Sequence, residues 1–139
     1  MRVLIVDDEE GICQTLTRKL RVEGILSEFS LSAVEALHRH RAEPYPVIIT
    51  DIRMPQMSGV EFIRELKKTH PTSIVFVMTG YASMEKLIDC LEYGAADFFA
   101  KPFDDLDLVI KSIREALDRH QRWIRTLVDA KSSVGDATG

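Results

Sequence analysis

Short runs of aliphatic and β-branched residues alternate along this chain with segments in which apolar residues recur every three or four positions. The apolar runs, each of which predicts a strand, are 2–6 (RVLIV), 25–29 (ILSEF), 46–50 (PVIIT), 73–79 (SIVFVMT) and 96–100 (ADFFA). A helical pattern follows every one of them. Strands that are apolar throughout and joined through helices form parallel sheets covered on both faces. The alternation therefore predicts a doubly wound α/β fold of (βα)5 type.

The run at 25–29 is shorter and alternates between apolar and polar residues, which favours the edge of the sheet. This fits a flavodoxin-like, five-stranded parallel sheet in the order 2-1-3-4-5. The expected helix N-caps are Ser32, Ser58 and Asp104, and the expected stop residues are Gly24 and Gly94.

The composition places the chain among ordinary globular domains. Its 139 residues, 45% hydrophobic and 29% charged, suit one domain with a real core. A net charge of −4 argues against direct binding to nucleic acid. No apolar stretch reaches the roughly 18 residues that span a bilayer, and the N-terminus enters a strand directly. We therefore expect no membrane partner, no signal peptide and a cytoplasmic location.

Cysteine and histidine residues offer little chemistry. Cys13 and Cys90 lack metal-ligand or redox spacing, so we expect two buried free thiols. The histidines are scattered along the chain, which argues against a metal site built from them.

Polar residues follow four of the predicted strands. They are Asp7 and Asp8 after the first strand, Asp51 after the third, Thr79 at the end of the fourth and Lys101 after the fifth. In an open α/β sheet, ligands bind outside the carboxyl ends of the strands. Taken singly, each residue has an ordinary explanation as a turn residue, a helix cap or a surface charge. Three carboxylates at one sheet edge repel one another, however, unless a cation neutralises them.

A hard cation suits such a set. Magnesium prefers oxygen ligands, uses one or two carboxylates and commonly shares its shell with phosphate. Lysine supplies a positive charge for a phosphate oxygen, and threonine supplies a hydroxyl hydrogen bond. The sequence therefore predicts a magnesium-assisted phosphoryl site with a carboxylate that can act as nucleophile.

Four stretches resemble the receiver domain of two-component response regulators, which has a chemotaxis-regulator-like fold. They are 4–9 (LIVDDE), 50–59 (TDIRMPQMSG), 77–82 (VMTGYA) and 96–103 (ADFFAKPF). The resemblance covers residues 1–119. The second and fourth stretches are similar to receivers that precede transcriptional output domains, which implies the N-terminal domain of a transcriptional response regulator.

The resemblance implies a role for each matching acidic residue. Asp51 would be the phosphoacceptor and would take its phosphoryl group from a sensor histidine kinase. Asp8 and Asp51 would bind Mg²⁺ through their side chains, Asp7 would help through water, and Arg53 would offer its backbone carbonyl. Such a domain would not be an enzyme, beyond catalysing its own phosphorylation and slow dephosphorylation.

The remaining matches imply a switch. Thr79 would bond a phosphoryl oxygen and Lys101 would pair with another, while Phe98 would be the switch aromatic that rotates inward. The face formed by the fourth helix, fifth strand and fifth helix would then change and meet the partner. Plain core packing is the alternative for Phe98. The Lys101–Pro102 bond would be cis, and Tyr81 would help control access of water.

Three other classes of protein compete with this reading. A flavin mononucleotide carrier needs a phosphate-binding loop after the first strand, where this chain has acids that repel phosphate. A haloacid-dehalogenase-like phosphatase needs a second acid two residues after its nucleophile, and position 53 is arginine. A docking module that never takes phosphate is disfavoured by the full acidic set and Lys101.

The last predicted helix carries a seven-residue repeat that continues beyond the expected end of the domain. Its members are Leu106, Ile110, Ile113, Leu117, His120, Ile124 and Leu127. We expect the receiver domain at 1–119, an extension of the last helix at 120–130 and a disordered tail or linker start at 131–139. The extension either folds back or pairs with a second copy as a short coiled coil. A homodimer through the face described above is the other dimer expected. We expect either an output domain that follows in the full protein or a complete chain that signals by docking alone.

Overall fold

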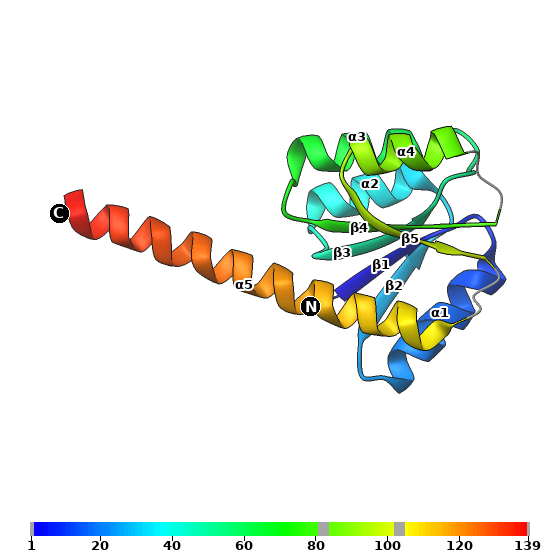
Figure 1. The fold of residues 1–139 in the computed structure, drawn as a ribbon, viewed down its shortest axis with the longest axis horizontal. Helices are drawn as coiled ribbons and strands as arrows, with labels where there is room; N and C mark the ends of the chain where they lie inside the picture. Colours follow the sequence, from blue (N-terminus) through cyan, green and yellow to red (C-terminus); the bar gives the residue numbers. More distant parts are fainter. Residues whose placement is uncertain (1, 81–83, 102–104, 139) are drawn as a thin grey trace.

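The computed structural model describes residues 2–80, 84–101 and 105–138 and confirms the predicted (βα)5 fold. The strands are β1 (Arg2–Val6), β2 (Leu26–Ser30), β3 (Val47–Asp51), β4 (Ile74–Thr79) and β5 (Ala95–Ala100). The helices are α1 (Glu10–Val22), α2 (Ala33–Ala42), α3 (Gly59–Thr69), α4 (Met84–Glu92) and α5 (Leu106–Thr138). All strand pairs are parallel, and their order is β2-β1-β3-β4-β5 (Figure 1).

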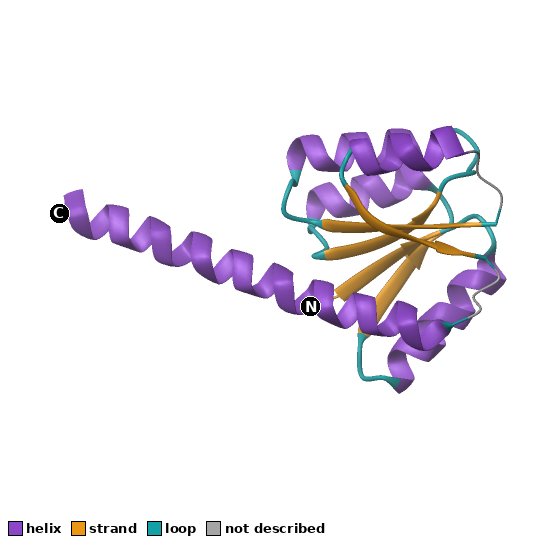
Figure 2. Ribbon diagram, viewed as in Figure 1, coloured by secondary structure: helices purple, strands orange, loops and turns teal. Residues whose placement is uncertain are grey.

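The sheet is covered on both faces, with α1 and α5 on one side and α2, α3 and α4 on the other (Figure 2). Successive strand residues point to opposite faces. In β1, Val3 and Ile5 therefore pack with α1 and α5, whereas Leu4 and Val6 pack with α2 and α3. Two apolar cores result, one on each side of the sheet.

The chain reverses its direction of travel across the sheet between β1 and β3. It moves outward from β1 to β2 and then returns, so that β3 pairs with the other side of β1. In open α/β sheets, this switch point is where a crevice forms at the carboxyl ends of the strands. Asp7 follows β1 and Asp51 ends β3, so both acids stand at the switch point.

The predicted helix caps are mostly confirmed. Ser32 and Ser58 each accept a hydrogen bond from the backbone N–H three residues on, and Gly24 and Gly94 have positive φ angles of 78° and 109°. Asp105 caps α5, since its Oδ1 accepts from the Leu108 backbone N–H at 3.0 Å. The cap predicted at Asp104 lies outside the described residues.

Helix α5 continues to Thr138, through the segment for which the sequence predicts a disordered tail or the start of a linker. Extending an existing helix adds one hydrogen bond for each residue that is fixed, without the cost of a new nucleus. The extension stands clear of the rest of the domain (Figure 1). No helix in the described part of the chain is both long enough and hydrophobic enough to cross a bilayer.

Candidate functional site

The sheet brings the predicted site residues to one edge. The Asp7 N–H extends the β1–β2 ladder by donating to the Ser30 carbonyl at 3.2 Å. At the other side of the site, the Lys101 N–H donates to the Thr79 carbonyl at 3.0 Å. The backbones that carry these side chains are thus fixed by the sheet itself.

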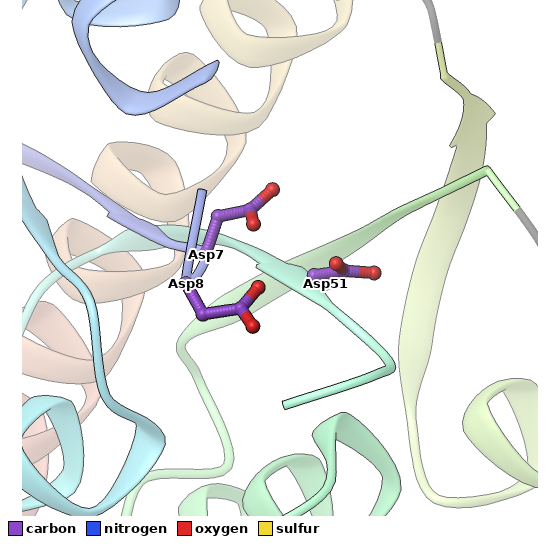
Figure 3. A group of neighbouring side chains, drawn as sticks. All are labelled: Asp7, Asp8 and Asp51. Atoms are coloured by element: carbon purple, nitrogen blue, oxygen red, sulfur yellow. The ribbon is translucent and has the colours of Figure 1, made fainter. Parts of the chain in front are cut away.

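Three carboxylates gather at this edge. Oxygen atoms of Asp7, Asp8 and Asp51 all lie within 4.8 Å of one another. Figure 3 shows Asp7 and Asp8 projecting toward the side where Asp51 lies. Asp7 and Asp51 are buried, and Asp8 is exposed. The like charges predicted from the sequence are therefore close enough to require compensation.

Lys101 supplies part of that compensation. Its Nζ lies 2.6 Å from Asp7 Oδ2 and 3.1 Å from Asp51 Oδ2, with Glu9 Oε1 at 3.9 Å. Burial works to lower the pKa of Lys101, but the two aspartates outweigh it, so the pKa lies above its usual value. The lysine is therefore a permanent cation between the two buried acids.

Asp51 is held by the segment that follows it. The Ile52 N–H donates to Asp51 Oδ1 at 2.7 Å, and the Gly59 N–H donates to the Ile52 carbonyl at 2.8 Å. A Cβ on Gly59 would overlap the Asp51 carbonyl oxygen and approach Ile52 Cα to 2.7 Å. The start of α3 can lie this close only because residue 59 is glycine.

A cavity of about 490 Å³ opens above these residues. It is lined by Asp8, Glu9, Ile12, Asp51, Arg53, Thr79, Gly80 and Lys101. The Thr79 hydroxyl is buried, and no group among the described residues forms a hydrogen bond with it. Buried hydroxyls are normally paired, so the Thr79 hydroxyl has hydrogen-bonding capacity that the described residues leave unused.

The donor set fits Mg²⁺ and a phosphoryl group. Lys101 offsets one of the three negative charges of Asp7, Asp8 and Asp51, and a divalent cation would offset the other two. Glu9, whose Oε1 lies 3.9 Å from Lys101 Nζ, adds a further negative charge at the cavity. All the candidate ligands are oxygens, as magnesium prefers. Lys101 and the Thr79 hydroxyl are donors suited to phosphoryl oxygens.

Phe98 stands apart from this group. Its side chain is 46% exposed, so it is not packed in the core, whereas Phe99 is buried and contacts Phe76 with ring centroids 5.6 Å apart. The other predicted residues that line the cavity are Asp8, Asp51, Arg53, Thr79 and Lys101, while Asp7 is fully buried and contacts the cavity residue Lys101. Tyr81 and the Lys101–Pro102 bond involve residues outside the described ranges.

Sequence reasoning missed two contributors. Glu9 lines the cavity, and its signal was its place directly after Asp7 and Asp8. In the sequence, only its position after the Ser58 cap pointed to Gly59. The close contact with the Asp51 backbone that requires glycine forms only when the loop between them is folded.

The sequence profile of the response regulator receiver domain matches residues 3–114. The chain is 33% identical over 135 residues to the regulatory protein AtoC of Escherichia coli strain K12, which covers 95% of this chain and 29% of AtoC. It is 34% identical over 133 residues to the transcriptional regulatory protein FixJ of Azorhizobium caulinodans, covering 96% of this chain and 62% of FixJ. The chain thus spans less than two thirds of these relatives.

Solved receiver structures share the fold. The beryllofluoride-activated NtrC4 receiver domain dimer superposes with a TM-score of 0.79 at 34% identity, covering 86% of this chain and 98% of that one. A receiver domain protein from Methanospirillum hungatei gives a TM-score of 0.81 at 33% identity, covering 87% and 96%. Together with the acidic edge of the sheet, these matches establish that the chain belongs to the response regulator receiver domain family.

Proposed function

We propose that this chain is a phosphorylation-controlled switch in which Asp51 accepts a phosphoryl group from a sensor histidine kinase. The observation that carries this proposal is the placement of Asp51 at a cavity that also holds the Lys101 cation and the Thr79 hydroxyl, which has no hydrogen-bond partner among the described residues. Receiver domains are signalling domains, and the chemistry proposed is confined to gain and slow loss of the phosphoryl group on the chain itself.

The transfer needs one bond to form and one to break. A carboxylate oxygen of Asp51 attacks the phosphorus of a phosphohistidine, and the phosphorus–nitrogen bond breaks as the phosphorus–oxygen bond forms. The imidazole nitrogen of the kinase keeps the electron pair and takes up a proton. Lys101 stabilises charge on one phosphoryl oxygen, and Thr79 donates its hydroxyl hydrogen to another.

Mg²⁺ is the proposed cofactor. Asp8 and Asp51 would hold it through carboxylate oxygens, Asp7 through water and Arg53 through its backbone carbonyl. The bound ion would neutralise charge on the transferring phosphoryl group. The support is the net charge of the acidic cluster and its all-oxygen donor set.

The proposed response is a change at the face made by α4, β5 and α5. Phosphorylation adds negative charge and acceptor oxygens, which draw Thr79 inward and leave room for Phe98 to turn in. That face already exposes large apolar side chains, namely Ile88, Leu91, Phe98 and Leu108. A surface of this kind suits a protein partner.

The proposed partners follow from the relatives. AtoC is named a regulatory protein and FixJ a transcriptional regulatory protein, and both are longer than this chain. We propose an output domain C-terminal to residue 139 and a cytoplasmic location, with DNA contact left to the output domain. The solved NtrC4 receiver is a dimer. A homodimer is proposed here too, through the α4–β5–α5 face or through the extension of α5.

Phosphoryl uptake tests the proposal. The protein is incubated with Mg²⁺ and acetyl phosphate, and its intact mass is measured for wild type, Asp51→Asn and the exposed control Asp118→Asn. We expect one added phosphoryl group in wild type and Asp118→Asn, a clear reduction when Mg²⁺ is chelated, and none in Asp51→Asn. Uptake by Asp51→Asn, or no uptake by wild type, would overturn the proposal.

A further inference from the structure

Glu9 stands at the start of α1, but its side chain does not cap the helix. In α1, which is described throughout, the first turn receives no hydrogen bond from this N-cap side chain. N-cap residues usually use a side-chain oxygen for that bond. The Glu9 carboxylate lines the cavity that holds Asp51, and its Oε1 lies 3.9 Å from Lys101 Nζ. Its negative charge therefore acts on the proposed phosphoryl site.

The backbone of Glu9 is held in place by three hydrogen bonds. Its N–H donates to Asp7 Oδ1 at 2.9 Å. Its carbonyl accepts from the N–H of Ile12 at 3.1 Å and from the N–H of Cys13 at 3.3 Å. The side chain can change its rotamer, but its point of attachment beside the cavity is fixed by the sheet edge and by α1.

Glu9 lies on the open side of the site. The side chains of Asp51 and Lys101 are each 8% exposed, whereas that of Glu9 is 65% exposed. Lys101 already pairs with Asp7 at 2.6 Å and with Asp51 at 3.1 Å, so its contact with Glu9 is the longest of the three. An exposed ion pair of this kind contributes little to stability. The Glu9 charge is therefore free to act on an ion that enters the cavity.

The direction of the proposed transfer carries the leaving group toward Glu9. In phosphoryl transfer, the attacking and leaving atoms lie roughly in line on opposite sides of the phosphorus. Asp51 is buried and meets the donor from the floor of the cavity, so the leaving group departs toward the open side, where Glu9 stands. A carboxylate at that place repels an anion and attracts a cation.

We propose that Glu9 selects the phosphoryl donor by the charge of its leaving group, favouring donors that release a basic nitrogen over acyl phosphates, which release a carboxylate. The inference rests on the proposed transfer to Asp51 and adds a residue that sets its donor specificity. Glu9 acts through its charge alone and forms no bond to phosphorus.

The two donor classes differ in what becomes of the electron pair of the broken bond. With phosphoramidate, an oxygen of Asp51 bonds to phosphorus as the phosphorus–nitrogen bond breaks, and the nitrogen leaves as ammonia and takes up a proton to become ammonium. With acetyl phosphate, the phosphorus–oxygen bond breaks and acetate leaves as an anion. Acetyl phosphate is also a dianion at neutral pH, whereas phosphoramidate is a monoanion. Glu9 therefore opposes both the entry and the departure of the acyl donor.

Glu10 provides a matched control. It is the next residue along the chain, it is likewise acidic and exposed, and it is not among the described residues that line the cavity. Its Oε1 accepts from Gln14 Nε2 at 3.5 Å on the surface of α1. Glu10→Gln thus removes the same charge from the chain as Glu9→Gln, but outside the cavity.

Rates of phosphoryl uptake from two donors test the proposal. The protein is incubated with saturating Mg²⁺ and either acetyl phosphate or phosphoramidate, and its intact mass is followed over time. We expect Glu9→Gln to raise the ratio of the acetyl phosphate rate to the phosphoramidate rate about fivefold at low salt, which is the effect of one unit charge a few ångströms away in a solvated site. Glu10→Gln should leave the ratio unchanged, and Glu9→Asp, which keeps the charge, should stay within about twofold of wild type.

Salt gives a readout that a purely structural role of Glu9 would not change. At an ionic strength of about 1 M the Debye length falls to about 3 Å, so the donor ratios of wild type and Glu9→Gln should converge. A weaker affinity for Mg²⁺ or a local distortion in Glu9→Gln would slow uptake from both donors and leave the ratio as it is in wild type.

An unchanged donor ratio in Glu9→Gln, or an equal change in Glu10→Gln, would overturn this inference and leave the proposed switch standing. Uptake from neither donor in wild type, or uptake that persists in Asp51→Asn, would overturn the switch and this inference together. Failure of the donor selection is therefore distinguishable from failure of the proposed function.

Discussion

The two ends of the sheet carry polar clusters that differ in how completely they are paired. At the amino end, His40 Nδ1 accepts from the Tyr45 N–H at 3.0 Å, and its Nε2 lies 3.4 Å from Ser73 Oγ. Ser73 Oγ donates to the Tyr45 carbonyl, and Lys67 Nζ donates to the Ser73 carbonyl at 2.6 Å. We call His40, Tyr45, Lys67 and Ser73 the His40 cluster. Its polar groups satisfy one another.

The carboxyl edge is built differently. Lys101 forms ion pairs with Asp7 and Asp51, and Asp8 lies close to both acids. The Thr79 hydroxyl has no hydrogen-bond partner within the described part of the chain. A fully paired buried network stabilises one fold, whereas an incompletely paired one is costly unless a ligand completes it. The difference indicates that the His40 cluster contributes to the stability of the fold, and it supports the proposal that the carboxyl edge binds a ligand.

The largest expected effect comes from the backbone support of the carboxyl edge. Gly59→Ala should lower the free energy of unfolding by about 2–4 kcal/mol, because its Cβ would overlap the Asp51 carbonyl. It should also reduce phosphoryl uptake. Urea unfolding measures the first effect. Gly11→Ala is the control, since nothing lies within 4 Å of its Cβ, and a stabilisation of up to about 1 kcal/mol is expected there. Equal results for the two variants would contradict this account.

Replacing one lysine at each end of the sheet tests the difference between the carboxyl edge and the His40 cluster. Lys101→Met should cost about 3 kcal/mol without metal because it leaves Asp7 and Asp51 uncompensated, and Mg²⁺ should restore part of the loss. Lys67→Met, whose ammonium bonds backbone carbonyls, should cost about 1 kcal/mol and gain no extra stability from Mg²⁺. Denaturant titrations with and without Mg²⁺ measure both. The same Mg²⁺ response in both variants would break the comparison.

The His40 cluster should respond to pH. Burial, with a smaller contribution from His70, lowers the pKa of His40 to about 4 from its usual 6.5. Because the unfolded chain binds the proton more readily, stability should be full above pH 6.5 and fall as the pH drops toward 4. The loss at pH 5 should be about 2 kcal/mol. Unfolding free energies measured between pH 4 and 7 check this.

A matched pair of histidine variants isolates that slope. His40→Asn keeps an acceptor for the Tyr45 N–H, so we expect it to flatten the pH dependence. The exposed His38→Asn should leave the dependence as it is in wild type. A slope that persists unchanged in His40→Asn would assign it to other groups.

The smallest effect concerns the loop before α3. Gln56 has a φ of 71°, which is unfavourable for residues with a side chain. Gln56→Gly should therefore raise the melting temperature slightly, by a stabilisation of about 0.5–1 kcal/mol. Gln14→Gly, inside α1, should instead destabilise by about 1 kcal/mol. Destabilisation by Gln56→Gly would show that the Gln56 side chain contributes something beyond backbone strain.

The residues at the carboxyl edge of the sheet could be predicted from the sequence because their convergence depends only on where the strands end along the chain. Apolar runs locate the strands, and parallel strands end on the same side, so Asp7, Asp51, Thr79 and Lys101 had to converge. The caps at Ser32 and Ser58 were predictable from local residue patterns, whereas the strand order was predicted from the likeness to a flavodoxin-like fold. The roles assigned to these residues stay predictions until phosphorylation is measured.

Features that depend on tertiary contact or on near-equivalent neighbours could not be predicted. Gly59 is required by the Asp51 backbone eight residues earlier in the chain. The α5 cap sits at Asp105, and two adjacent aspartates give nearly the same signal. The last residues are predicted as a disordered tail or the start of a linker because Ser and Gly are weak helix formers, and in the structure they continue a helix that the domain has already nucleated.

The most direct test of the central claim is to locate the phosphoryl group. After incubation with Mg²⁺ and acetyl phosphate, borohydride reduces an aspartyl phosphate to homoserine, and peptide mass spectrometry identifies the position. The account predicts homoserine at residue 51 in wild type and in Asp118→Asn. Homoserine at Asp7 or Asp8, or a phosphoryl group found only on histidine, would contradict it.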